Sequence, residues 1–131
     1  MRRSKLVWLS LMCVLLLAAI GAAVAQSNPF EQLVFDTRAD LELLADQVLS
    51  PGVRPPEWSS NSDLQSPTVV SDLWFDNEIL ANAIFGPDTR PANWIGATVA
   101  VNEILARNVR HDLEVSADEV LGREQRPPEW R

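Results

Sequence analysis

Cysteine is almost absent from this sequence of 131 residues: Cys13 is the only example, and there is no tyrosine. Cys13 lies within an apolar segment at the N-terminus, so the remainder of the chain has no thiol at all. A disulfide framework is therefore excluded for that remainder, and its stability must come from the packing of side chains.

Positive charge is scarce as well. Lys5 is the only lysine, and residues 26–131 carry eight arginines against 18 aspartates and glutamates, a net charge of −10. Binding to nucleic acid depends on cationic contacts to phosphates, so we expect no nucleic-acid partner. The same excess of acids disfavours contact with an anionic membrane surface.

The N-terminal segment is predicted to be a secretory signal peptide over residues 1–25. A basic cluster at residues 2–5 precedes an apolar run, and residues 23–25 are the small Ala-Val-Ala that a signal peptidase requires. The alternative is an uncleaved membrane anchor, because about 20 apolar residues span a hydrocarbon core of about 30 Å. Both interpretations predict a secreted or extracytoplasmic protein, and only the anchor predicts contact with a membrane.

A pentapeptide recurs along the chain. Arg54-Pro55-Pro56-Glu57-Trp58 returns unchanged as Arg126-Pro127-Pro128-Glu129-Trp130, and a looser copy ends at Trp94. The three tryptophans are 36 residues apart, and superposition at that period aligns the upstream segments without a gap. We infer three tandem units: repeat 1 over 26–58, repeat 2 over 59–94 and repeat 3 over 95–131.

Each unit is predicted to open with a helix. In repeat 1, Leu41, Leu44 and Val48 follow the spacing of one buried helical face. An Asn-Pro or Ser-Pro pair marks the start of the first two helices, and glycine marks the end of the second and third. The pattern predicts helices over 29–50, 67–85 and 102–121.

The segment after each helix is predicted to be an extended arm. In polyproline II geometry an arm covers about 3.1 Å per residue, so it can run back along a helix of about 30 Å. The predicted fold is all-α, with three tandem 36-residue units, each one helix plus a Pro/Trp extended arm. The units pack as a three-helix bundle or as a short helical array, preceded by an apolar N-terminal signal helix. The outer faces of the helices carry an apolar column that the recurrent tryptophans would cover: Leu43, Ile79 and Val115.

The recurrent tryptophans and arginines are the candidate binding residues. A tryptophan offers a flat apolar face to a sugar ring or a proline-rich peptide, and an arginine can clamp a ligand carboxylate through two hydrogen bonds. The alternative, which we favour for both sets, is that each tryptophan packs on its own helix and each arginine pairs with a recurrent acid. The candidates are Trp58, Trp94, Trp130, Arg54, Arg90 and Arg126, and the acids are Asp40, Asp76, Asp112, Glu42, Glu78 and Glu114.

Neither a metal site nor a catalytic site is predicted. The two acids of each Asp-x-Glu pair are about 200° apart on a helix, so they cannot grip one calcium ion, and we expect a solvated acidic face instead. His111 is the sole histidine and cannot build the usual zinc site alone. No nucleophile elbow, phosphate loop or zinc-helix motif is present, so we expect no catalytic residues, no metal and no cofactor.

These features favour an exported, non-catalytic helical repeat module that contacts another protein or the cell envelope, with self-association as a further mode of contact. The alternative function is an envelope carbohydrate-binding module that uses the repeat tryptophans as platforms. We do not expect an enzyme.

Overall fold

The computed structural model describes residues 28–97 and 101–131, where it has three helices and no strand: α2 (Pro29–Leu49), α3 (Val69–Phe85) and α4 (Asn102–Leu121). Each helix packs against the other two, so the helices form a bundle rather than an open row. The all-α prediction is confirmed. The predicted signal segment, 1–25, lies outside the described residues.

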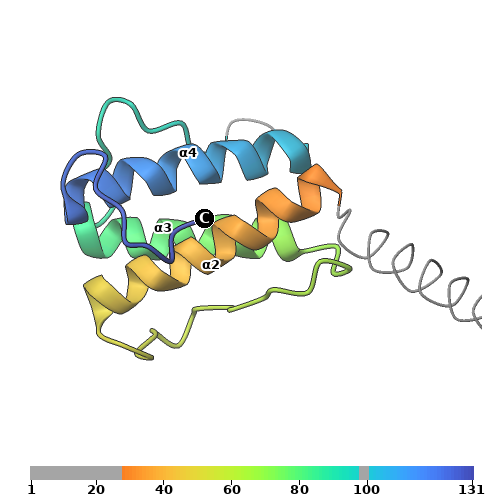
Figure 1. Ribbon diagram of the computed structural model, residues 1–131, viewed down its shortest axis with the longest axis horizontal. Coiled ribbons are helices and arrows are strands. Elements are labelled where there is room, and N and C mark those ends of the chain that lie inside the picture. Colours follow the sequence, from red (N-terminus) through yellow and green to blue (C-terminus); the bar gives the residue numbers. More distant parts are fainter. Residues whose placement is uncertain (1–27, 98–100) are drawn as a thin grey trace, which may run out of the picture.

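All three helices run in the same direction, and an extended segment after each one turns back along the bundle (Figure 1). We call these segments the first arm (residues 50–60), the second arm (residues 86–96) and the third arm (residues 122–131). Parallel neighbours require such a return, because each helix must begin at the end of the bundle opposite to where the previous one stopped. No helix in the described part of the chain has the length and apolar character needed to cross a membrane.

The helix starts depend on local caps. The side chain of Asn28 accepts the N–H of Phe30 at 2.9 Å, and Pro29 occupies the first helical turn, as predicted. α3 begins two residues later than predicted, because the Ser66 hydroxyl accepts the Thr68 N–H at 3.3 Å and holds a separate turn before the helix. The start of α4 is as predicted.

The helix ends share one backbone conformation. Gly86 and Gly122 follow α3 and α4 with φ of 98° and 97° and ψ of 158° and 152°. This region is open to glycine and strained for any residue that has a Cβ atom. Ser50 occupies the corresponding place after α2, with φ 92° and ψ 150°, so this helix end is strained.

Replacing Ser50 with glycine should raise the free energy of unfolding by about 1 kcal/mol, because the relief of strain exceeds the extra chain entropy that glycine loses on folding. Urea denaturation followed by circular dichroism measures the change. The matched control is Gly86→Ser, which should lower the stability by a similar amount. A destabilised Ser50→Gly variant would contradict this account of the helix end.

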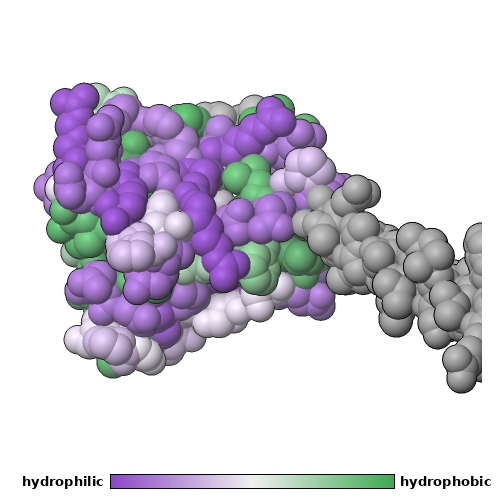
Figure 2. Space-filling model, in the orientation of Figure 1, coloured by the Kyte–Doolittle hydropathy of each residue, from purple (hydrophilic) through white to green (hydrophobic). Residues whose placement is uncertain are grey.

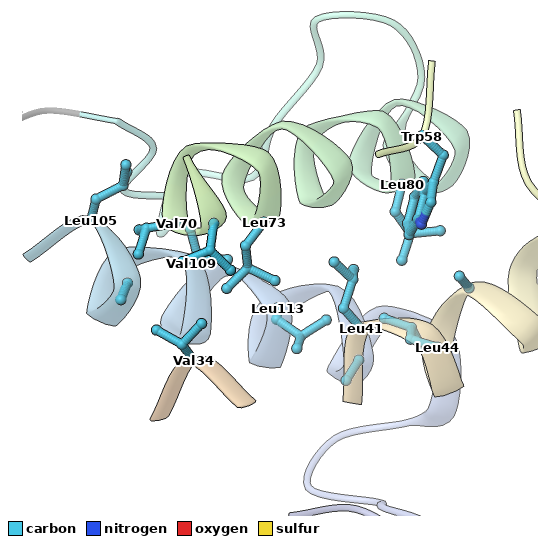
Figure 3. Packing of buried hydrophobic residues seen from close by; sticks show 14 residues of the cluster. Val34, Leu41, Leu44, Trp58, Val70, Leu73, Leu80, Leu105, Val109 and Leu113 are labelled. Atoms are coloured by element: carbon cyan, nitrogen blue, oxygen red, sulfur yellow. The ribbon is translucent and has the colours of Figure 1, made fainter. Parts of the chain in front are cut away.

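The core lies between the three helices and receives apolar side chains from each of them (Figure 3). Leu41, Leu73 and Leu113 are fully buried, one on each helix. Trp58 belongs to the same cluster although it comes from the first arm; it is 8% exposed and lies near Leu80 in Figure 3. The first arm is therefore part of the core.

Three polar side chains also lie in the core. Thr37, Asn77 and Ser116 come from three different helices and are at most 1% exposed. When the sequence is aligned at a spacing of 36 residues, each of them falls in a column whose other two members are apolar, and the three columns lie at different positions along the helices. Each helix is thereby chemically distinct in the core, which favours one order of packing over its permutations.

Candidate functional site

The arginine of the first arm is bound to the helix that precedes it. Arg54 Nε donates to Glu42 Oε2 at 2.8 Å, and its Nη2 donates to the Glu42 carbonyl oxygen at 3.1 Å and to Asp46 Oδ1 at 2.8 Å. Of the recurrent acids that the sequence offers as partners, the aspartates and the glutamates, the arginine thus pairs with the glutamate. The same contacts recur for Arg90 with Glu78 and Asn82, and for Arg126 with Glu114 and Asp118.

The indole of each arm binds the same glutamate as the arginine. Trp58 Nε1 donates to Glu42 Oε1 at 2.9 Å, and the guanidinium carbon of Arg54 lies 5.5 Å from the centre of the ring. The equivalent distances are 3.1 and 5.4 Å at Trp94, and 3.0 and 5.4 Å at Trp130, both of which are half-buried. Each indole therefore donates its N–H within the chain and has an arginine over its ring. Trp130 has two, because the guanidinium carbon of Arg110 also lies 5.5 Å from the centre of its ring. We call each such set of arginine, tryptophan and glutamate a clasp.

The recurrent aspartates hold each arm from the other side. Asp76 of α3 accepts the backbone N–H groups of Ser59 at 2.8 Å and Ser60 at 3.1 Å, just after the tryptophan of the first arm. The first arm therefore lies in a seam between its own helix, α2, and the next helix, α3. In the second seam, between α3 and α4, the N–H groups of Ile95 and Gly96 donate to Asp112 at 2.9 and 2.8 Å.

The third arm closes the bundle on itself. The N–H of Arg131 donates to Asp40 Oδ1 at 2.9 Å, so this arm lies in a third seam between α4 and the first helix, α2. Figure 1 shows the arm returning between these two helices. The hydrogen bond between Arg131 and Asp40 joins residues that are 91 positions apart in the sequence. The corresponding bond of the first seam, between Ser59 and Asp76, joins residues only 17 positions apart.

The predicted solvated acidic face is wrong for the aspartates. Asp40 and Asp76 are 0% exposed and Asp112 is 1% exposed. The reason is the angle that separates the two acids of each pair on a helix. The glutamate faces the arm of its own helix, and the aspartate faces the arm in the seam on the other side. The geometry that prevents the two acids from sharing an ion thus allows one helix to hold two arms.

Ion pairs to the buried aspartates reinforce two of the three seams. Arg38 of α2 lies 2.7 Å from Asp76 of α3, and Arg110 of α4 lies 2.7 Å from Asp40 of α2. In the second seam Trp74 stands where the other helices have arginine, and no arginine of the described chain pairs with Asp112. Burial raises the pKa of Asp112 above its usual range, although the two backbone N–H groups oppose the shift.

Some residues of these contacts were not among the candidates predicted from the sequence. Arg38 and Arg110 join neighbouring helices, and the arms also bind a polar residue one turn after each glutamate. The signal was available in the 36-residue alignment, which places the two arginines in one column. The second column is Asp46, Asn82 and Asp118.

A groove of about 500 Å³ lies beside the third arm. Leu43 and Leu44 of α2 line one side, and Pro127 and Trp130 of the arm line the other. Leu43, the apolar residue on the outer face of α2, therefore shares this groove with the tryptophan of the third arm and not with the tryptophan of its own arm. The remaining lining residues are Asp46, Gln47, Pro51, Leu121, Gln125, Arg126 and Glu129.

No protein-family model matches this chain, and neither a curated protein nor a solved structure matches it. Residues 28–97 and 101–131 contain no group of three or more histidine, cysteine, aspartate or glutamate side chains placed to hold a metal ion. His111 is exposed, and its Nε2 lies 2.9 Å from the carbonyl oxygen of Asn93.

Acid is expected to weaken the first and third arms. The pKa of Asp46 and that of Asp118 are both lowered, first by a backbone N–H, of Gly52 and Glu124 respectively, and then by the arginine of the arm. A carboxyl group with a lowered folded pKa contributes stability above its usual pKa of 3.8 and loses that contribution as the pH falls through the folded value.

Asn82 supplies the matched comparison, because it accepts the equivalent hydrogen bonds without a charge, from Arg90 at 2.8 Å and from the Asp88 N–H at 3.2 Å. The double variant Asp46→Asn/Asp118→Asn should therefore keep the fold. We expect its free energy of unfolding to fall less steeply than that of the wild type between about pH 4 and about pH 2. Urea denaturation at a series of pH values measures the slopes, and equal slopes would refute the assignment.

Proposed function

We propose that residues 26–131 form an exported, non-catalytic module that binds another macromolecule through a rigid surface. The observation that supports this proposal is that the recurrent residues form hydrogen bonds within the chain. The arginines, tryptophans and glutamates bind one another, and the aspartates bind the arms. Side chains engaged in this way hold the fold together and are not free to act on a substrate.

We propose further that the module consists of three copies of one unit. In all three arms the arginine follows its glutamate partner by 12 residues, and the tryptophan follows the same glutamate by 16. Duplication of one unit accounts for recurrence in both the sequence and the contacts. Export is proposed from the basic and apolar pattern of residues 1–25.

Rigidity is what the clasps add to binding. An arm held at its arginine, its indole and the following N–H groups has little freedom left to lose when a partner docks on it. The face that carries the third arm is largely hydrophilic, with apolar residues in small separate patches (Figure 2). Such a surface suits a module that stays in solution until it meets its partner.

The test is capture from an envelope extract. The full chain, immobilised through a tag, should retain at least one protein after mild chemical cross-linking, and an excess of untagged chain should compete for that protein. Size-exclusion chromatography with light scattering tests self-association in parallel. A strictly monomeric chain that retains no competable protein would overturn the proposal.

The carbohydrate-binding alternative has less support. A sugar stacks on an open ring face and accepts hydrogen bonds from nearby donors. Here each indole N–H is already donated to a glutamate, and one face of each ring is covered by an arginine. Tryptophan fluorescence and acrylamide quenching, measured against a panel of cell-wall glycans, should not change. Protection of the indoles by one glycan would restore this alternative.

A further inference from the structure

The groove beside the third arm has an apolar floor that no side chain of the arm closes. Trp58 is 8% exposed at the corresponding place in the first arm, whereas Trp130 is half-buried and lines the groove. Leu43 and Leu44 of α2 and Pro127 of the arm complete the apolar part of the lining. A volume of about 500 Å³ is in the range of sites that hold a small ligand or a short peptide segment.

The rim of the groove carries polar groups with unused bonding capacity. The side-chain amides of Gln47 and Gln125 line it, and neither makes a hydrogen bond within the described residues. Glu129 also lines the groove, is exposed and makes no ion pair with the described part of the chain. The two other charged lining residues have ion-pair partners: Asp46 shares Arg54 with Glu42, and Arg126 pairs with two acids of α4. The uncompensated charge of the groove is therefore negative.

We propose that this groove binds a basic, proline-rich segment of a partner protein in the polyproline II conformation. Such a segment is already extended, so it loses little entropy on docking against prolines and an aromatic edge. Its backbone carbonyls make no internal hydrogen bonds, and the amides of Gln47 and Gln125 can donate to them. Its cations meet Glu129 on a chain whose residues 26–131 carry a net charge of −10. The inference rests on the proposed function and names the chemistry of the partner.

The molecule contains a precedent for this kind of recognition. In the first seam, the chain's own Arg54-Pro55 segment lies between two helices, with the guanidinium over the indole of Trp58 and bound to Glu42. The groove offers a second segment the same three elements, namely an aromatic edge, apolar helix residues and a free carboxylate. It lies next to an arm that is already docked.

The test uses the synthetic peptide Pro-Pro-Arg-Pro-Pro-Arg-Pro and the full chain labelled with nitrogen-15. On titration, the indole N–H signal of Trp130 should shift and saturate, while those of Trp58 and Trp94 stay in place as internal controls. A peptide with glycine in place of every proline tests whether charge alone suffices, and one with glutamine in place of both arginines tests whether charge is needed. Both should bind about fivefold or more weakly.

Two matched pairs of variants locate the site. Glu129→Lys should weaken binding by about fivefold or more, whereas Glu57→Lys, at the same place in the identical pentapeptide but outside the groove, should change it by less than about twofold. Gln47→Lys should weaken binding, and Ala83→Lys, at the equivalent exposed position of α3, should not. An unchanged melting temperature shows that each variant is folded.

The proposal is overturned if the Trp130 signal does not move, if the glycine peptide binds as well as the proline peptide, or if both members of a matched pair lose binding equally. Each of these results leaves the capture of an envelope protein unaffected. Failure of the peptide therefore counts against this occupant of the groove, and failure of the capture counts against the module itself.

Discussion

Replacing Trp58 with alanine should lower the free energy of unfolding by about 3–5 kcal/mol, the range observed when a large buried side chain is deleted from a core. The ring is 8% exposed and belongs to the apolar cluster between the helices. The substitution also removes the hydrogen bond to Glu42 at 2.9 Å and the ring beneath Arg54. Urea denaturation followed by far-ultraviolet circular dichroism measures the loss.

Trp130→Ala is the matched control for this substitution, because Trp130 makes the same hydrogen bond to Glu114 at 3.0 Å but is only half-buried. Its loss of stability should be smaller than that of Trp58→Ala, in proportion to the apolar surface that each ring removes from water. A change of less than about 0.5 kcal/mol for Trp58→Ala, as surface substitutions give, would show that the first arm does not belong to the core.

The second large effect is expected at Asp76, where Asp76→Asn should destabilise the fold by about 3 kcal/mol. The carboxylate is fully buried and lies 2.7 Å from Arg38, whose side chain is 7% exposed. It also accepts the N–H groups of Ser59 and Ser60. Asparagine removes the nearer of the two carboxylates that pair with Arg38 and leaves only Glu42, at 3.2 Å. A buried guanidinium with a weakened ion pair is costly because water cannot replace the lost charge.

Asp112→Asn separates the ion pair from the other contacts. Asp112 is as buried as Asp76 and also accepts two backbone N–H groups, but it faces no arginine of the described chain. Removing the charge of Asp112 leaves no buried arginine without its ion-pair partner. The free energy of unfolding should therefore fall by only about 1–2 kcal/mol, the cost of an impaired hydrogen bond. Chemical denaturation of both variants at neutral pH measures the difference. If the two variants lose equal amounts of stability, the Arg38–Asp76 ion pair is not the reason for the large effect expected at Asp76.

The local elements of this protein could be predicted from its sequence because the signals that set them are local. The apolar spacing that includes Leu41 and Leu44, with the cap at Asn28, predicts the first helix to within one residue of its end. The sequence predicts that Arg54 pairs with a recurrent acid, and its partner Glu42 is only 12 positions away. Contacts at such separations follow from a helix and an arm that returns along it.

The contacts between helices could not be predicted in the same way. Nothing in the spacing of Asp40 shows that it receives the N–H of Arg131, 91 residues further along the chain. That contact exists because three parallel helices close into a bundle, so that α4 and its arm meet α2. The same closure buries the aspartates, which the sequence led us to place in solvent, and it brings Leu43 beside Trp130.

The sequence by itself therefore determined where the helices and arms lie along the chain and which residues recur in them. Only the tertiary structure decided which arm each aspartate binds, how deeply each indole is buried, and that a groove remains beside the third arm. The physical reason is that helical periodicity and caps act over a few residues. Burial and the seams depend instead on which surfaces meet when the whole chain packs.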